Sequence, residues 1–423
     1  MITLASPKQP PIEQQKDWYP YYAGFTSAFV TDVFKSYLEL AKSVVDPWNG
    51  SGTTTAVAAS RSVTSMGIDI NPALSVVARA RLTPKSIADS LAPIAADIAA
   101  AAEKSTPAKR EHDPLLVWLG PAASNEIRKL QRAIHLVTAA DDALEVDLST
   151  GDESAPSRLP LITAFFYSAL FAATRDLLRR FRGSNPTWMV APTSPHKRLR
   201  PRPETIRVAF TDRVDYLSSR LQIIKPDSNE LASILTGRAS VILSDQHSFD
   251  ACLTSPPYAT RIDYIKSSAP ELSVLGLSTD FITTLRQQST GTPLVRGVNR
   301  IEGDIPEEAQ DLVERVAGHE SHGSANYYAP WLRNYLAEIH KALELIAARV
   351  KPAGRIALVV QDSYYKSLHI DLQKLVTASL GAAGRSLIAQ HDFPVRHALS
   401  NMNANARRHL PIRKHRESLL VFE

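Results

Sequence analysis

Short apolar runs alternate with helix-periodic segments in the first and last parts of the chain. Over 44–81 the pattern predicts strand, helix, strand and helix, and the same alternation resumes at 207. Strands that alternate with helices in this way are typical of an α/β fold, in which helices cover both faces of a largely parallel sheet. The elements expected after 207 are helices over 211–223 and 331–350, strands over 240–243 and 249–254, and a last strand over 417–423 that pairs with one starting near 386.

The middle of the chain has a different pattern. Helical periodicity runs from about 87 to 134 and again over 161–181, whereas 141–160 is acidic, Ser-rich and typical of a loop. The prolines of 183–203 forbid long regular structure and favour an extended backbone. We therefore expect a largely helical insertion.

These patterns divide the 423 residues into one interrupted domain and its appendages. A Pro/Gln-rich stretch over 1–16 is expected to be a flexible arm. The α/β domain would occupy 17–81 and 207–423, with the helical insertion at 82–206 between its two parts. A polar, Gly-rich stretch over 278–324 predicts a mobile loop in the second part.

A glycine-rich turn follows the first expected strand. The stretch 44–55 reads VVDPWNGSGTTT, and Gly50 and Gly52 allow the backbone to approach a ligand closely. The helix that starts near Thr53 offers free N–H groups to a carboxylate or hydroxyl. The next strand ends in Asp69, where an acid typically accepts hydrogen bonds from ribose hydroxyls. The turn is neither a Walker loop nor a dinucleotide fingerprint.

A second motif follows a buried strand at 251–258, which reads ACLTSPPY. Its two prolines fix the backbone and remove two N–H donors, so that carbonyl oxygens can face a ligand. Ser255 adds a hydroxyl acceptor, and Tyr258 adds a flat ring with a polar tip. These groups suit an exocyclic amino group whose base stacks on the ring, although a proline-rich turn that merely closes a strand is the alternative interpretation.

Both motifs resemble those of S-adenosylmethionine-dependent DNA amino-methyltransferases. The Gly-rich stretch resembles their motif I, DP(F/W)xGSGTT, with Asp69 as the motif II acid, and SPPY resembles motif IV, (Asp/Asn/Ser)-Pro-Pro-(Tyr/Phe/Trp). The resemblance covers about half of the chain and implies a Rossmann-like methyltransferase sheet. The motif order, with the insertion after motif I, is that of the alpha group, whereas the wording of the motifs is more usual in the beta group, so the subgroup stays open.

The resemblance implies S-adenosylmethionine as the cofactor, no metal, and two sets of site residues. The target base would be held by Ser255, Pro256, Pro257 and Tyr258. The cofactor would be held by Phe25, Thr26, Asp46, Pro47, Gly50, Ser51, Gly52, Thr53, Asp69, Ile70, Asp245 and Thr254. The enzyme would flip the base out of the duplex, stack it on Tyr258 and accept its amino hydrogens at Ser255 and the Pro256 carbonyl. Serine at the first position favours N4 of cytosine over N6 of adenine.

The charge distribution suits a polyanionic partner, since the formal net charge is +5 and the basic residues cluster. Basic residues interleaved with prolines and Trp188 indicate a DNA-contact loop in the insertion; solvated surface charge, or a packed loop around Trp188, is the alternative. The expected DNA-contact residues are Arg182, Trp188, Lys197, Arg198, Arg200, Arg202, Arg407, Arg408 and Arg413.

The single cysteine excludes several chemistries. Cys252 cannot form an intramolecular disulfide or a cysteine-cluster zinc site, and its place inside a strand predicts a core residue. Cytosine-C5 methylation needs a thiolate nucleophile, typically in a Pro-Cys pair, and the chain has none. Since no membrane span or signal peptide is evident, we expect a cytoplasmic protein.

The favoured hypothesis is therefore a site-specific DNA methyltransferase whose partner is double-stranded DNA. The resemblance admits a cognate restriction endonuclease as a second partner, and either a monomer or a homodimer. Three alternatives stay open: an adenine-N6 DNA methyltransferase, an RNA (tRNA) amino-methyltransferase, and a catalytically silent DNA-binding subunit.

Overall fold

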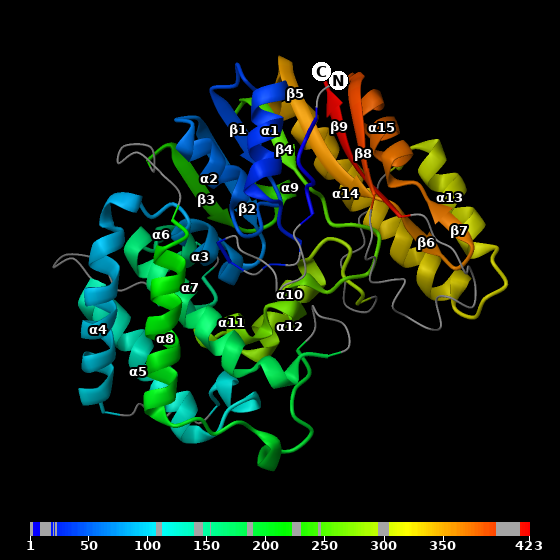
Figure 1. The fold of residues 1–423 in the computed structure, drawn as a ribbon. Coiled ribbons are helices and arrows are strands. Elements are labelled where there is room, and N and C mark those ends of the chain that lie inside the picture. Colours follow the sequence, from blue (N-terminus) through cyan, green and yellow to red (C-terminus); the bar gives the residue numbers. More distant parts are fainter. Residues whose placement is uncertain are drawn as a thin grey trace.

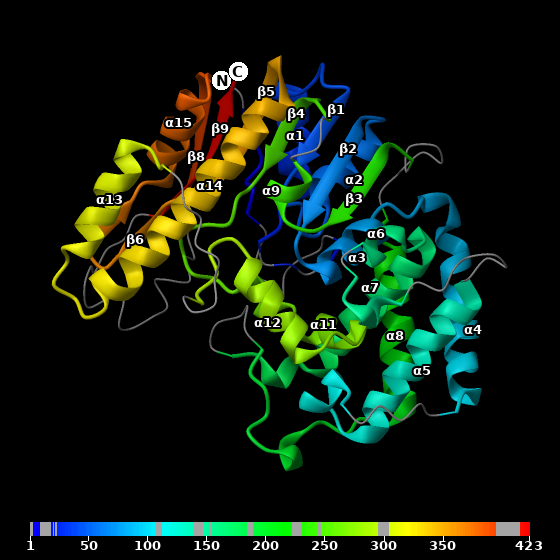
Figure 2. The same cartoon turned by 180° about the vertical axis from the view of Figure 1, so that it is seen from behind.

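The computed structural model consists of an α/β layer and a helical region beneath it in the view of Figure 1. The structure describes residues 3–8, 18–19, 21, 23–106, 112–138, 147–152, 154–183, 189–221, 230–243, 247–294, 304–394 and 415–423. The two chain ends lie close together at the top of the sheet in both views (Figures 1 and 2).

The sheet has seven strands in the order β3-β2-β1-β4-β5-β9-β8. Pairing is parallel from β3 to β5, and β9 is antiparallel to both of its neighbours. This confirms the expected α/β fold and the pairing of the last strand with the one near 386. The strands are β1 (Ser43–Asp46), β2 (Thr64–Asp69), β3 (Ala232–Thr236), β4 (Phe249–Thr254), β5 (Val350–Gln361), β8 (Leu387–Pro394) and β9 (Arg416–Phe422).

The strand order reverses between β1 and β4. From β1 the chain continues through β2 to β3, and it then returns to pair β4 with the other edge of β1. A crevice forms at the carboxyl ends of the strands at such a switch point, and ligands of open α/β sheets bind there.

Alternate residues of the central strands pack against helices on opposite faces of the sheet. Val44 packs in a core with α1 (Ser27–Tyr37) and α2 (Thr53–Ser60). Val45 packs on the other face in a core with α13 (Glu307–Ala317), α14 (Ala329–Arg349) and α15 (Leu372–Ala382), as the two-residue period of a strand requires.

The helical region shares its core with the α/β layer. Val76 and Val77 of α3 (Pro72–Ala80) and Leu272 of α11 (Ala269–Leu275) belong to the same buried cluster as the inserted helices. The inserted helices are α4 (Ala88–Lys104), α5 (Pro121–Thr138), α6 (Ala155–Arg158), α7 (Leu161–Leu177) and α8 (Pro203–Ser218). The expected boundary at 206/207 falls inside α8, which packs on α4, α5 and α7.

Three expected elements differ from the structure. The apolar run expected as a strand over 240–243 belongs to a short helix, α9 (Ala239–Ile242), and the third strand is instead β3. Such short apolar runs suit a buried helix as well as a strand. The helix expected over 211–223 starts earlier, at the proline that begins α8, because proline is favoured in a first helical turn.

The stretch 278–324, expected as one loop, contains α12 (Thr279–Gln288) and α13. Ser278 caps α12 by accepting a hydrogen bond from the Phe281 N–H. The amphipathic helix expected over 331–350 is confirmed as α14. The structure also contains α10 (Tyr264–Ser267), and β6 (Ser363–Tyr365) and β7 (Leu368–Ile370) form a separate two-stranded sheet.

Candidate active site

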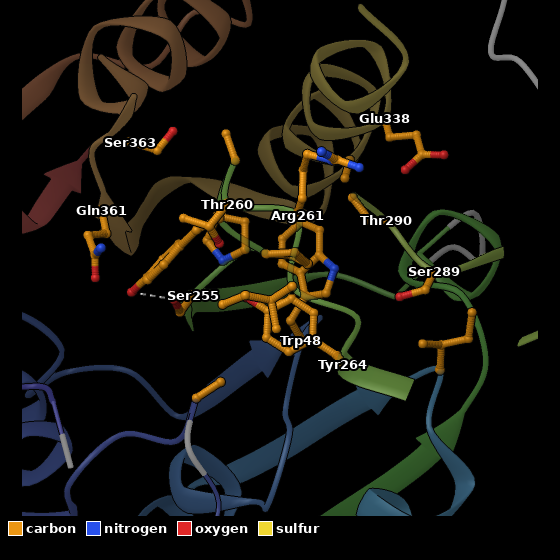
Figure 3. A pocket seen from close by; sticks show the side chains of 18 of the residues that line it. Trp48, Ser255, Thr260, Arg261, Tyr264, Ser289, Thr290, Glu338, Gln361 and Ser363 are labelled. Carbon is orange, nitrogen blue, oxygen red and sulfur yellow. Dashed lines mark hydrogen bonds between the residues drawn. The ribbon is translucent and has the colours of Figure 1, made fainter. Parts of the chain in front are cut away.

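A cavity of about 770 Å³ opens at the carboxyl ends of the parallel strands (Figure 3). Its volume lies in the range typical of small-molecule sites. The segments that follow β1, β2, β3 and β4 contribute to its wall, together with α14 and β9. From these segments come, among others, Pro47, Trp48, Asp69, Ile70, Gly237, Arg238, Ser255, Tyr258, Glu338 and Glu417.

Asp69 holds the glycine-rich turn against the end of β2. Its carboxylate accepts hydrogen bonds from the backbone N–H groups of Gly50, at 2.9 Å, and Asn71, at 2.8 Å. Gly50 has a φ of 52°, in the left-handed region that glycine tolerates. Burial raises the pKa of Asp69 to about 6, although these two hydrogen bonds oppose the shift. The turn therefore places a carboxylate at the cavity wall.

The turn also packs closely on α3. Gly52 has a φ of 80°, and a Cβ atom there would lie 2.7 Å from the Ala78 Cβ. Any larger residue would both strain the backbone and push α2 away from α3. Glycine at this position thus allows the two helices to approach.

Asp46 turns away from the cavity, although it ends the neighbouring strand. It is 2% exposed, and it accepts hydrogen bonds from Thr254 Oγ1, at 2.6 Å, and the Trp48 N–H, at 3.2 Å. Burial raises the pKa of Asp46 to about 6, against the opposing effect of its hydrogen bonds. Asp46 therefore links the ends of β1 and β4.

The Ser-Pro-Pro-Tyr segment is held by hydrogen bonds at three of its residues. The Ser255 hydroxyl lies within donor distance of two acceptors, the Val359 carbonyl at 3.0 Å and Tyr258 Oη at 3.2 Å. Tyr258 Oη donates to Glu417 Oε1 at 2.8 Å. The hydroxyl of Tyr335, on α14, donates to the Pro257 carbonyl at 2.8 Å.

The carbonyl of Pro256 differs from these groups. Within the described part of the chain it accepts no hydrogen bond, and Pro256 borders the cavity. Because the next residue is also a proline, no N–H donor stands beside this carbonyl. The geometry leaves an acceptor for a bound donor.

The structure brings some of the expected site residues to the cavity and leaves others behind its wall. Those that border it are Phe25, Pro47, Asp69, Ile70, Ser255, Pro256, Pro257 and Tyr258. Those that do not border it are Thr26, Asp46, Gly50, Ser51, Gly52, Thr53 and Thr254. Thr26 instead caps α1 by accepting from the Phe29 N–H at 3.2 Å. Asp245 lies outside the described residues.

Sequence reasoning missed several residues of the wall. Trp48 could have been found, because it lies within the glycine-rich motif itself. No spacing pointed to Arg238, which follows a strand that the sequence placed elsewhere, or to Glu417, in the last strand. No spacing in the sequence pointed to Arg261 either.

Arg261 is held in a strained conformation at the cavity. Its φ is 56°, unusual for a residue with a side chain. Its guanidinium lies 4.8 Å from the ring centroids of both Tyr327 and Tyr328 and 5.8 Å from that of Trp331. Aromatic rings attract a cation at this range, which fixes Arg261 at the wall.

The expected DNA-contact residues that the structure describes differ in their exposure to solvent. Lys197, Arg200 and Arg202 are exposed, and Arg182 and Arg198 are half-buried. Their loop is anchored by backbone hydrogen bonds from Gly120 N to Leu199 O, at 2.7 Å, and from Leu199 N to Trp118 O, at 3.0 Å. Trp188, Arg407, Arg408 and Arg413 lie outside the described residues.

Two arginines on either side of this stretch of the sequence serve packing instead. Arg175 is buried and donates to Glu271 at 2.5 Å, and Arg207 pairs with Glu126 at 2.7 Å. Elsewhere in the described ranges, no group of three or more His, Cys, Asp or Glu is arranged to hold a metal ion. None of the described helices combines the length and apolarity needed to cross a bilayer.

Comparisons with known proteins find distant similarity to a methyltransferase. No family model matches the chain. The chain is 26% identical over 291 residues to the Type II methyltransferase M.BsoBI of Geobacillus stearothermophilus, an alignment that covers 64% of this chain and 54% of that protein. The chain thus spans about half the length of this curated relative.

Among solved structures, the chain aligns with the rRNA methyltransferase aviRa from Streptomyces viridochromogenes. The alignment covers 95% of this chain and 87% of that one, with 11% identity and a TM-score of 0.27. Similarity at this level supports no conclusion about function.

Proposed function

We propose that this protein is an S-adenosylmethionine-dependent methyltransferase that acts on the exocyclic amino group of a DNA base. The observation that carries the proposal is the convergence of Asp69 and Ser255–Tyr258 on one cavity at the switch point of the sheet. The sequence similarity to a Type II methyltransferase supports it.

The residues at the cavity fit the cofactor. The Asp69 carboxylate borders the cavity and keeps unused lone pairs beside its two backbone hydrogen bonds, so it can accept from ribose hydroxyls. Phe25, Pro47 and Ile70 offer apolar surface nearby. When bound, S-adenosylmethionine would supply an electrophilic methyl group. The residues of the glycine-rich turn that do not border the cavity would support this site by shaping the turn.

The Ser-Pro-Pro-Tyr segment would hold the target amino group. The Pro256 carbonyl and Ser255 Oγ would accept its two hydrogens, which favours a more tetrahedral nitrogen whose lone pair is free to attack. The role of these residues would be positioning and electrostatic stabilisation, with no covalent intermediate on the protein. Tyr258 would stack on the base while Glu417 holds its hydroxyl in place.

We further propose double-stranded DNA as the partner and N4 of cytosine as the acceptor. A base inside a duplex hides its amino group, so it must be flipped into the cavity. The exposed side chains of Lys197, Arg200 and Arg202 would contact phosphates. Serine at position 255 is the feature that favours cytosine, and N6 of adenine is the alternative acceptor.

Mass spectrometry of nucleosides tests the proposal directly. Unmodified genomic DNA of mixed sequence is incubated with the protein and S-adenosylmethionine, in parallel with tRNA and with a Tyr258→Ala control. N4-methylcytosine in DNA is the expected product. N6-methyladenine would keep the mechanism and reverse the choice of base, whereas methylation of tRNA alone would contradict the DNA assignment. No product on either substrate, despite measurable cofactor binding, would contradict the enzymatic role.

A further inference from the structure

A row of hydrogen-bonded groups leads from the candidate target site to a buried carboxylate. Ser255 Oγ lies 3.2 Å from Tyr258 Oη, which lies 2.8 Å from Glu417 Oε1. Glu417 is 6% exposed and borders the same cavity as Ser255. It comes from β9, whose pairing with β5 opposes Glu417 to Gln361, and Gln361 lies on the Ser255 side of the cavity in Figure 3.

The chemistry of the three groups decides which of them donates and which accepts each hydrogen bond. An ionised carboxylate can only accept, so the Tyr258 hydroxyl must donate its proton to Glu417. The lone pairs of Tyr258 Oη then remain to accept from Ser255. The Ser255 proton can also point to the Val359 carbonyl, and turning it towards Tyr258 completes a continuous path.

Methyl transfer to an amino nitrogen creates a need for such a path. The nitrogen becomes cationic when it takes up a methyl group, and it must then lose a proton. A serine hydroxyl can accept that proton only if it releases its own at the same time. An aspartate at position 255 could keep the proton, whereas Ser255 requires a further acceptor.

We propose that Glu417 is the terminal acceptor of this proton, an inference that rests on the proposed methyl transfer. The N–H bond of the methylated amino group breaks as the proton passes to Ser255 Oγ. Ser255 passes its hydroxyl proton to Tyr258 Oη, and Tyr258 passes its own to Glu417 Oε1. Both hydroxyls are restored, the product amino group is neutral, and the carboxylate ends as a carboxylic acid.

The electrostatics of the site agree with these roles. Burial, and then the Glu417 carboxylate, raise the pKa of Tyr258 well above its ordinary value, so Tyr258 relays a proton without persisting as a phenolate. Burial also raises the pKa of Glu417, while the Tyr258 hydrogen bond and the charge of Lys8 oppose the shift. Glu417 therefore holds a proton better than an exposed glutamate would.

Few charged or titratable side chains surround Glu417 within the described residues. Lys8 faces it from the N-terminal segment and Tyr258 from the loop after β4. His415, which directly precedes β9, also borders the cavity. The residues paired with Glu417 on β5 and β8, Gln361 and Phe393, carry no charge.

The test compares single-turnover methylation of unmodified genomic DNA across pH in the wild type, Glu417→Gln and Tyr258→Phe. Glutamine keeps an acceptor for the Tyr258 hydroxyl but cannot take a proton. Phenylalanine keeps the ring for stacking but interrupts the path. We expect each variant to lose about 100-fold or more in rate and to lose the acidic limb of the pH profile, with cofactor affinity unchanged. The double variant should be no slower than the slower single one, because both changes interrupt one path.

Glu338→Gln is the matched control. Glu338 borders the opposite side of the cavity (Figure 3), and burial raises its pKa to about 7. No hydrogen bond among the described residues connects it to Ser255, so this variant should keep the acidic limb of the wild type.

The outcomes that contradict the proton path and those that contradict methyl transfer are distinguishable. A Glu417→Gln protein with the wild-type rate and acidic limb would overturn the proton path while leaving methyl transfer intact. If Glu417→Gln does not fold, Tyr258→Phe decides: a wild-type rate and an unchanged solvent isotope effect would overturn the path. A wild type that yields no methylated product would overturn the proposed function, and the path with it.

Discussion

Two aspartates that end neighbouring strands show how one side chain's direction sets its role. Asp69 borders the cavity, where two backbone N–H groups hold its carboxylate. Asp46 points into the protein and joins β1 to β4 through Thr254. Burial raises the pKa of both to about 6, so the two roles are separated by the quantity measured: cofactor affinity for Asp69 and stability for Asp46.

Asp69→Asn should weaken S-adenosylmethionine binding about tenfold or more, because a hydrogen bond to a charged acceptor contributes roughly 1.5–3 kcal/mol. In the wild type, affinity should fall as pH decreases through about 6, where Asp69 becomes protonated, and it should be flat in the variant. Calorimetric titration measures both. The exposed Asp280→Asn serves as the charge control, and unchanged affinity in Asp69→Asn would remove this residue from the cofactor site.

Asp46→Asn should change the pH dependence of stability. The ordinary pKa of 3.8 is raised to about 6 in the folded protein, so the native state binds the proton more tightly than the unfolded chain. The free energy of unfolding therefore falls as pH rises from about 4 to about 6. Asparagine keeps an acceptor for Thr254 and cannot ionise, so this fall should shrink by up to about 3 kcal/mol.

Urea titrations across this pH range measure that difference. A variant whose free energy of unfolding falls as steeply as that of the wild type would show that Asp46 does not carry the pH dependence.

Among the elements, the basic loop before α8 combines a fixed backbone with exposed cations. Its hydrogen bonds to Trp118 and Gly120 anchor it to the helical region, and Arg200 Cγ lies 2.9 Å from where a Cβ of Gly120 would be. A loop fixed in this way can present its basic side chains to phosphates with little loss of backbone freedom.

Replacing Arg198 and Arg200 together with alanine should weaken DNA binding and reduce the salt dependence of the binding constant, by a slope of about 2 if each contacts one phosphate. Fluorescence anisotropy of a labelled duplex at several salt concentrations measures the slope. Arg315→Ala, on α13, removes an exposed arginine elsewhere and should leave the slope unchanged. An unchanged slope in the double variant would place this loop away from the DNA.

For the whole molecule, a buried ion pair joins the helical insertion to the α/β layer. Arg175 of α7 donates to Glu271 of α11 at 2.5 Å and to the Ser267 carbonyl at 2.8 Å. The Tyr19 hydroxyl donates to the same Glu271 carboxylate at 2.8 Å. Since the hydrophobic core is also shared, we expect the two regions to unfold together.

Arg175→Met should destabilise the protein by about 3–5 kcal/mol, because it leaves the Glu271 carboxylate buried without its partner. Adding Glu271→Gln should recover much of this loss, since glutamine carries no charge and still accepts from Tyr19. Urea unfolding followed by far-ultraviolet circular dichroism measures both variants. Equal destabilisation in the single and double variants would show that the charge is not the cause.

The sequence by itself determined the features that depend on neighbouring residues. The alternation of strands and helices, the glycine turn after β1, Asp69 at the end of β2 and Ser-Pro-Pro-Tyr after β4 all follow from local periodicity and local backbone preference. The prediction of a strand over 240–243 was wrong for the same reason, because so short an apolar run does not distinguish a strand from a buried helix.

Only the tertiary structure decided which distant residues meet. Glu417 lies 159 residues after Tyr258 and reaches it because β9 inserts beside β5. Arg175 is one of several arginines close together in the sequence, and it is buried in an ion pair with Glu271. Asp46 is drawn inward by Thr254 on the paired strand. The period of a strand shows which residues share a face, but the order of strands in the sheet decides which side chains lie opposite them.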